Sequence, residues 1–130
     1  MADPNYQPVT INKSGGNVIL TVSCPDYPQS ISGTTEEYTV LANLPVNTYS
    51  FSTAQPQTTL GMPAAINQHY YAVDGAVLNQ NDDPPTQYQV QILITQDGKQ
   101  LALFKQPANG PGEISNADQY FLCKFQLVAA

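Results

Sequence analysis

The chain of 130 residues is acidic and poor in charge: 11% of its residues are charged, and the net charge at pH 7 is -6. An ordinary soluble domain is charged at about a quarter of its positions, and here Asn, Gln, Ser and Thr fill the shortfall. Nucleic-acid backbones and anionic membranes require clustered cations, which the four Lys and Arg residues do not supply, so both are excluded as partners.

The first ten residues, MADPNYQPVT, contain neither the basic segment nor the apolar run of a signal peptide. No apolar run in the sequence approaches the roughly 20 residues of a membrane span. We therefore expect one domain, residues 1–130, that is cytoplasmic or particle-associated, with non-classical export left open. The opening MADPNYQP resembles the start of some bacteriophage decoration proteins over these eight residues only.

Apolar and polar residues alternate along most of the chain, a period that predicts β-strands and no helix. In VTINKSGGNVILTVSC, Gly15-Gly16 is predicted to be the turn of a hairpin. That register sets Ile11 opposite Leu20 and Val9 opposite Val22. The Pro-rich stretch SCPDYPQSISG that follows is predicted to be a loop.

Three further strand patterns come next. EEYTVLANL is predicted to point Tyr38, Val40, Ala42 and Leu44 inward, and NTYSFST to point Tyr49 and Phe51 inward. In NQHYYAVDGAVLNQ, Asp74-Gly75 is predicted to be a hairpin turn that sets Val73 against Ala76 and Tyr71 against Leu78. The only histidine, His69, stands at the start of this segment, and we expect a partly buried ring bonded to the backbone.

The loop NQNDDPPTQ has oxygen-bearing side chains at Asn79, Asn81, Asp82 and Asp83, a spacing that resembles the start of calcium-binding loops. The glycine and the distal glutamate of an EF-hand are missing, so a solvated acidic turn is expected here and no metal is predicted. These four residues, together with Tyr27 and Tyr70, form an alternative candidate site for a sugar or a metal.

The clearest hairpin is YQVQILITQDGKQLALFKQ, with Asp97-Gly98 as a type I′ turn. The turn predicts that Ile94 faces Leu101 and that Ile92 faces Leu103. The other side of the hairpin then carries a candidate contact face made of Gln89, Gln91, Gln100 and Phe104. Amide side chains make hydrogen bonds and cost less to desolvate than charges, so this face suits contact with another protein or a sugar.

The closing segment DQYFLCKFQLVAA is predicted to bury Phe121, Cys123, Phe125 and Leu127. Cys24 is also in phase with the buried side of its strand. The two cysteines are expected to be shielded, either as reduced core thiols or as a disulfide between an early strand and the last one.

About nine short strands separated by Pro-, Gly- and Asn-rich turns predict an all-β fold, a single antiparallel β-sandwich of the immunoglobulin-like or jelly-roll type. Catalysis is not expected, because a hydrolytic triad needs a base and a zinc site needs several His or Cys ligands. No catalytic residue, cofactor or metal is therefore predicted.

Three functions are consistent with this composition and these sequence patterns. The first is a non-catalytic assembly, decoration or binding module whose partner is itself or another protein. The second is a lectin-like protein that binds carbohydrate. The third is a secreted effector or inhibitor that acts through the Pro-rich loop.

Overall fold

The computed structural model describes residues 5–27, 29–39, 44–78, 86–114 and 118–130. Within these ranges the chain forms eleven strands in three sheets and one short helix. The prediction of an all-β protein is confirmed. The expected number of about nine strands is too low: three short strands described below, β5, β7 and β10, are missing from the prediction, whereas the hairpin expected at Asp74-Gly75 is one strand, β6.

The largest sheet has five strands in the order β1-β11-β6-β3-β4. These are β1 (Gln7–Ile11), β11 (Gln119–Ala129), β6 (Tyr70–Leu78), β3 (Ser30–Tyr38) and β4 (Asn47–Ser52). The four-stranded sheet has the order β5-β2-β8-β9, formed by β5 (Gln57–Gly61), β2 (Val18–Ser23), β8 (Val90–Gln96) and β9 (Lys99–Gln106). A two-stranded sheet pairs β10 (Gly112–Ile114) with β7 (Thr86–Tyr88).

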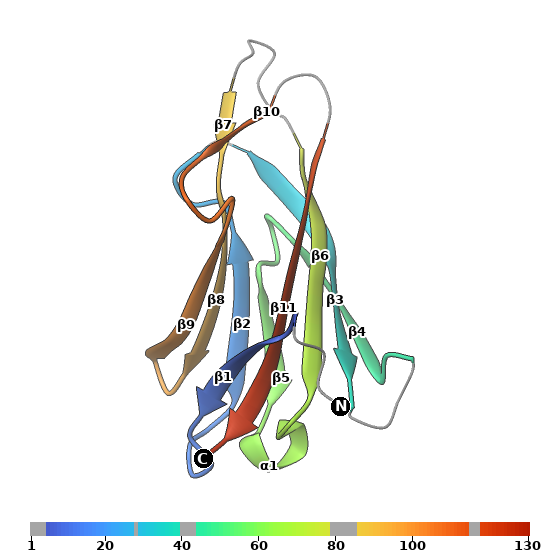
Figure 1. Cartoon of the computed structure of the whole chain (residues 1–130), viewed down its shortest axis with the longest axis vertical. Coiled ribbons are helices and arrows are strands. Elements are labelled where there is room, and N and C mark those ends of the chain that lie inside the picture. Colours follow the sequence, from blue (N-terminus) through green and yellow to red (C-terminus); the bar gives the residue numbers. More distant parts are fainter. Residues whose placement is uncertain (1–4, 28, 40–43, 79–85, 115–117) are drawn as a thin grey trace.

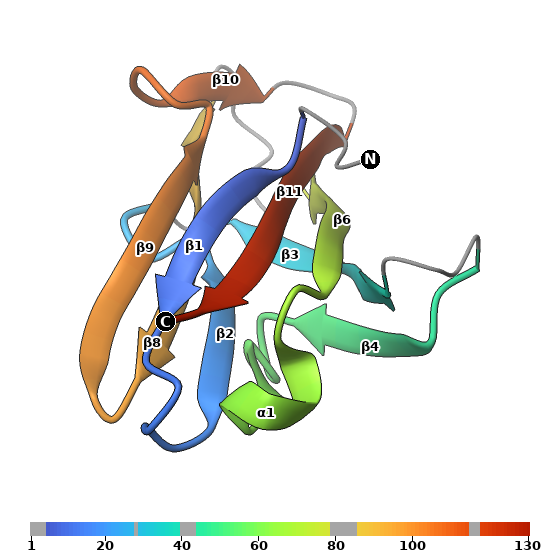
Figure 2. The same cartoon turned by 60° about the horizontal axis from the view of Figure 1, so that its bottom comes forward.

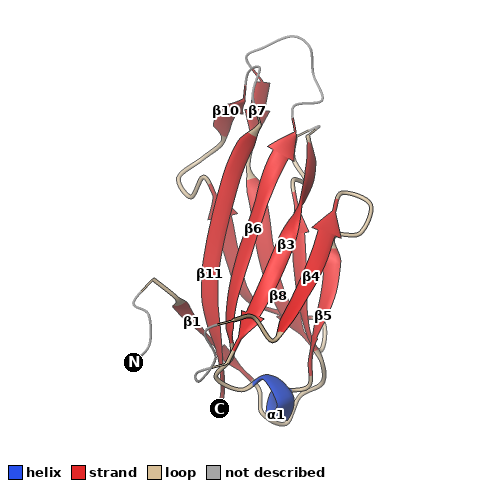
Figure 3. Ribbon diagram, turned by 90° about the vertical axis from the view of Figure 1, so that its right-hand side faces the viewer, coloured by secondary structure: helices blue, strands red, loops and turns tan. Residues whose placement is uncertain are grey.

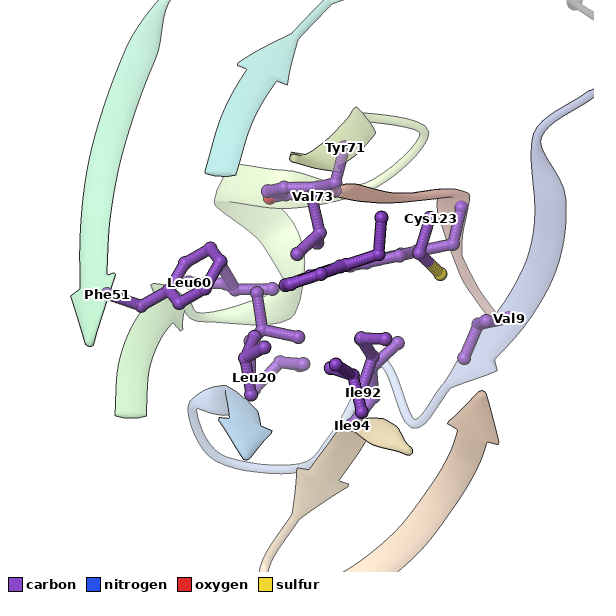
Figure 4. Packing of buried hydrophobic residues seen from close by; sticks show 14 of the residues in the cluster. Val9, Leu20, Phe51, Leu60, Tyr71, Val73, Ile92, Ile94 and Cys123 are labelled. Carbon is purple, nitrogen blue, oxygen red and sulfur yellow. The ribbon is translucent and has the colours of Figure 1, made fainter. Parts of the chain in front are cut away.

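The two larger sheets face each other in a sandwich-like arrangement, and Figure 3 shows the outer side of the five-stranded sheet. The small sheet lies at the upper end of Figure 1, and the one-turn helix α1 (Pro63–Ile66) lies at the lower end, which Figure 2 brings forward. Buried side chains of both sheets meet in one apolar cluster, among them Leu20, Ile92 and Ile94 from one side and Tyr71 and Val73 from the other (Figure 4). Burial of this apolar surface is the main force that holds the sheets together.

The first predicted hairpin is wrong. Strand β1 does not pair with β2: it pairs in parallel with β11, with Gln7 opposite Phe125 and Ile11 opposite Ala129. The segment around Gly15-Gly16 instead carries the chain from one sheet to the other. The buried faces of both strands are nevertheless as predicted, because the alternation fixes which side chains point inward but not which strand lies alongside.

The hairpin predicted at Asp74-Gly75 is also wrong, because both residues lie inside the continuous strand β6. Gly75 is opposite Gly33 of β3. A Cβ on Gly75 would come within 2.7 Å of the Phe121 ring and 2.8 Å of the Phe51 ring. The glycine is therefore needed for close packing of two aromatic rings, whose centroids are 6.1 Å apart, and not for a turn.

The Asp97-Gly98 turn is confirmed, with positive φ at both residues (53° and 75°), as a type I′ turn requires. The predicted register is wrong beyond the turn. A β-bulge between Ile94 and Thr95 shifts the pairing by one residue, so that Ile94 faces Ala102 and Ile92 faces Phe104.

Strand β3 begins earlier than expected and in the opposite phase. Thr35 and Glu37 are buried, whereas Tyr38 lies on the outer side, and Leu44 is 77% exposed outside any strand. The predicted inward positions Val40 and Ala42 lie outside the described residues. In contrast, Phe51 of β4 is buried and Tyr49 packs against the core, as predicted.

The burial predicted for the last strand is confirmed: Phe121, Cys123, Phe125 and Leu127 all belong to the core. Cys24 and Cys123 are both free thiols. Cys123 is buried and Cys24 is partly exposed. The structure therefore has two reduced thiols and not the alternative disulfide.

Candidate functional site

The outer face of the four-stranded sheet is the part of the molecule where most of the predicted contact residues lie. Residues directly opposite each other in paired strands share a face. Leu93 of β8 is opposite Leu103 of β9 and Thr21 of β2, and Ile19 lies diagonally next to Leu93. All four side chains are partly exposed, so a row of aliphatic groups crosses three strands on the side away from the core.

Uncharged polar side chains surround this row. Gln91 and Thr95 flank Leu93 on β8, and Gln100 is exposed opposite Thr95. Lys105, opposite Gln91, adds one positive charge. We call this set the outer sheet face, and its members are Ile19, Thr21, Ser23, Gln91, Leu93, Thr95, Gln100, Leu103 and Lys105.

Two of the four predicted contact residues are not on this face. Phe104 points to the core side, where its ring stacks on Phe125 with centroids 6.2 Å apart. The bulge accounts for this, because the one-residue shift exchanges the faces of every later residue in β9. Gln89 precedes β8 and donates its Nε2 to the Pro107 carbonyl at 2.9 Å, an internal hydrogen bond.

An open groove of about 420 Å³ lies where β1, β9 and β11 come together. Phe104 and Gln106 of β9 line one side of it, and Leu122, Cys123 and Lys124 of β11 line the other. Phe104 is thus a core residue whose edge borders a surface groove. This position differs from the predicted role as an apolar anchor among the glutamines.

A second arrangement, which the sequence did not predict, surrounds the buried carboxylate of Glu37. Its Oε1 accepts hydrogen bonds from Asn47 Nδ2 (2.8 Å) and Tyr49 Oη (3.2 Å). Its Oε2 accepts one from Tyr71 Oη and lies 2.7 Å from His69 Nδ1. The side chain of Glu37 is 2% exposed, so four polar groups from β4, β6 and the residue before β6 meet on one buried charge.

The electrostatics of this cluster favour the ionised carboxylate. Burial raises the pKa of Glu37, but hydrogen bonds from Asn47, His69 and Tyr71 and the charge of His69 outweigh it, so the pKa lies below its ordinary value. Burial and the nearby carboxylate raise the pKa of the Tyr71 and Tyr49 hydroxyls, which stay protonated donors.

The His69 ring is partly buried, as expected, but its Nδ1 faces the Glu37 carboxylate and not the backbone. The cluster links β3, β4 and β6, because its members come from these three strands and from the residue before β6. The sequence contains a signal for the buried carboxylate but not for its partners: Glu37 is in phase with Ile31 and Thr35 once the strand is begun at Ser30.

The residues of the alternative sugar or metal site are not brought together by the described structure. Tyr27 lies in the connection that leads into β3 at Ser30, which pairs with Leu78, whereas Tyr70 pairs with Tyr38 at the other end of the same ladder. The Tyr70 ring packs against Tyr6 with centroids 5.0 Å apart. Asn79, Asn81, Asp82 and Asp83 lie outside the described residues.

The Pro-rich loop is shorter than expected, because Ser30 to Gly33 belong to β3. What remains is the connection 24–29, in which Gln29 is buried and donates its Nε2 to the Gln87 carbonyl.

In the described ranges, no three His, Cys, Asp or Glu side chains gather in a way that could hold a metal ion. No helix in those ranges is long and apolar enough to cross a membrane.

Comparison with protein families, with curated proteins and with solved structures gave no match for this chain.

Proposed function

We propose that this protein is a non-catalytic binding or assembly module, a single β-sandwich domain that contacts another protein through the outer sheet face. The observation that carries the proposal is the aliphatic row of Ile19, Leu93 and Leu103, which is partly exposed on the outer side of the four-stranded sheet and surrounded by amides and hydroxyls. Interfaces typically have an apolar centre with few charges and a polar rim. The outer sheet face has this composition, with Lys105 as its charged member.

The fold supports the sandwich part of the proposal. A five-stranded sheet on a four-stranded one matches the strand count of the variable-type immunoglobulin sandwich, whereas a jelly roll has eight strands in two sheets. We therefore favour the immunoglobulin-like form of the two predicted sandwiches. An assembly role is also consistent with the cluster around Glu37, whose donors are directed at the carboxylate and not at a substrate cavity.

The test compares two variants of the outer sheet face with a matched control. Gln91→Glu and Leu103→Glu each place a carboxylate where a partner would desolvate it, which weakens a protein contact by about tenfold or more. Ser50→Glu adds the same charge on an exposed position of β4 in the other sheet. Gln89 is not used, because its internal hydrogen bond makes a substitution there a test of folding.

Binding is measured by retention of partner proteins from an extract of the source on the immobilised protein, and self-association by sedimentation equilibrium. The expected result is a partner or oligomer that is lost in both face variants and kept in Ser50→Glu. Equal behaviour of all four proteins, with melting temperatures unchanged, would refute the contact. Glycan-array binding by the wild type would then favour the carbohydrate alternative.

A further inference from the structure

Within the described ranges, the upper half of strand β11 is a sheet edge with a paired strand on one side only. On one side β11 pairs with β6 from Gln119 to Gln126. On the other side β1 pairs with it only from Phe125 to Ala129, so the backbone from Gln119 to Cys123 has no strand beside it within the described ranges. Figure 1 shows β11 continuing upward beyond the start of β1. An open strand edge is a template for pairing with another chain.

The same five residues carry an unusual amount of exposed apolar surface. Tyr120 is 79% exposed and Leu122 is 50% exposed. They are the only strand residues among the large exposed hydrophobic side chains of the described part of the chain, and the other three lie outside strands. The groove of about 420 Å³ borders this edge at Leu122 and Cys123.

We infer that a second copy of this chain pairs with this edge, antiparallel and with Phe121 opposite Phe121 of the second copy. In that register Tyr120 lies opposite Leu122 of the second copy, and the pair occurs twice because the arrangement is twofold symmetric. Aromatic and aliphatic side chains directly opposite each other are favourable cross-strand pairs. The exposed apolar row of β11 is therefore complementary to itself.

Charge supports the same register. Lys124 continues the outward row of Tyr120 and Leu122, and exposed Asp118 precedes it at the other end. With Phe121 at the centre, each Lys124 lies opposite Asp118 of the second copy, which gives two opposite-charge pairs. Lys124 also stands 5.4 Å from the centroid of the Tyr6 ring, a contact that holds its side chain on the outer side of the strand.

The contact deepens the assembly role by naming the partner, but it uses a different surface from the outer sheet face. A ladder of five residues is about 17 Å long, and such a contact is smaller than the standard interface of about 800 Å² per partner. The dimer is therefore expected to be weak, with a dissociation constant in the micromolar range.

The decisive experiment is a charge exchange measured by sedimentation equilibrium over micromolar protein concentrations. Asp118→Lys and Lys124→Asp each place like charges opposite each other and are expected to weaken the dimer by about tenfold. The double variant restores opposite pairs and should recover wild-type association. It also lacks the contact of Lys124 with Tyr6, so recovery cannot come from the fold of the monomer.

Leu122→Arg is expected to abolish the dimer, whereas Met62→Arg, at a side chain that is 51% exposed outside the strands, should leave it intact. A wild type that stays monomeric at the highest concentration, or a double variant that fails to recover, would overturn the inference. A dimer lost in Leu103→Glu but kept in Leu122→Arg would overturn it while supporting the outer sheet face. A dimer that is kept in Leu103→Glu but lost in Leu122→Arg would support pairing through the β11 edge. It would also show that self-association does not require the outer sheet face.

Discussion

Replacing Glu37 by leucine tests whether the buried carboxylate organises the lower end of the five-stranded sheet. Leucine removes the acceptor of four hydrogen bonds, from Asn47, Tyr49, His69 and Tyr71, while filling a similar volume. Removing one partner of a buried charged pair costs about 3 to 5 kcal/mol. We expect a loss of this size in the free energy of unfolding.

A double-mutant cycle isolates the contribution of the hydrogen bond between Tyr71 and Glu37 to the free energy of unfolding. Its side chain is fully buried, so its hydroxyl has no route to water once Glu37 is gone, and such an orphaned donor costs about 1 to 3 kcal/mol. Tyr71→Phe alone should therefore destabilise the wild type. In the Glu37→Leu background the same substitution should be neutral or stabilising, because it removes the orphaned donor.

Urea unfolding followed by fluorescence gives all four free energies of the cycle, with Glu36→Leu as the matched control. Glu36 is the neighbouring carboxylate, partly exposed on the outer side and bonded to Tyr38 Oη at 3.0 Å, so its loss should change stability by about 0.5 kcal/mol or less. Equal effects of the two leucine substitutions, or strict additivity of Glu37→Leu and Tyr71→Phe, would refute the reasoning.

The pH dependence gives an independent check on the same carboxylate. The pKa of Glu37 is lower in the folded protein than the ordinary value of 4.5. Its contribution to stability is therefore fully present above about that pH and is lost as the pH falls through the lower folded value. In Glu37→Leu this part of the acid destabilisation should be missing, whereas Glu36→Leu should keep it.

Three further predictions concern the core. Thr35→Val should leave stability unchanged or raise it by up to about 1 kcal/mol in urea unfolding, because the buried Thr35 hydroxyl has no hydrogen-bond partner among the described residues; a clear loss would reveal such a partner. Gly75→Ala should lower stability by about 1 to 3 kcal/mol, since its Cβ would meet aromatic rings, and a neutral result would contradict the ring packing. Alkylation followed by mass spectrometry should label Cys24 before Cys123 in the native protein, because burial raises the pKa of Cys123 to about 12; equal rates would show that Cys123 is accessible.

The candidate contact face could be predicted only in part from the sequence. Gln91 and Gln100 are on the expected side because alternation and the Asp97-Gly98 turn fix the register near the turn. Leu103, and not Phe104, lies on that side because a bulge shifts the pairing by one position. No residue near the bulge indicates it in the sequence. The Glu37 cluster could not be predicted because its members come from three strands and a preceding residue.

By itself the sequence determined the all-β class and the buried side of most strands, because a period of two is a local property that each segment carries on its own. It determined the Asp97-Gly98 turn for the same reason, since positive φ at two residues is a local preference. Only the tertiary structure decided which strands lie side by side. Pairing depends on contacts far apart in the chain, so the parallel alignment of β1 with β11 and the pairing of Gly33 with Gly75 could not be read from residues next to each other in sequence.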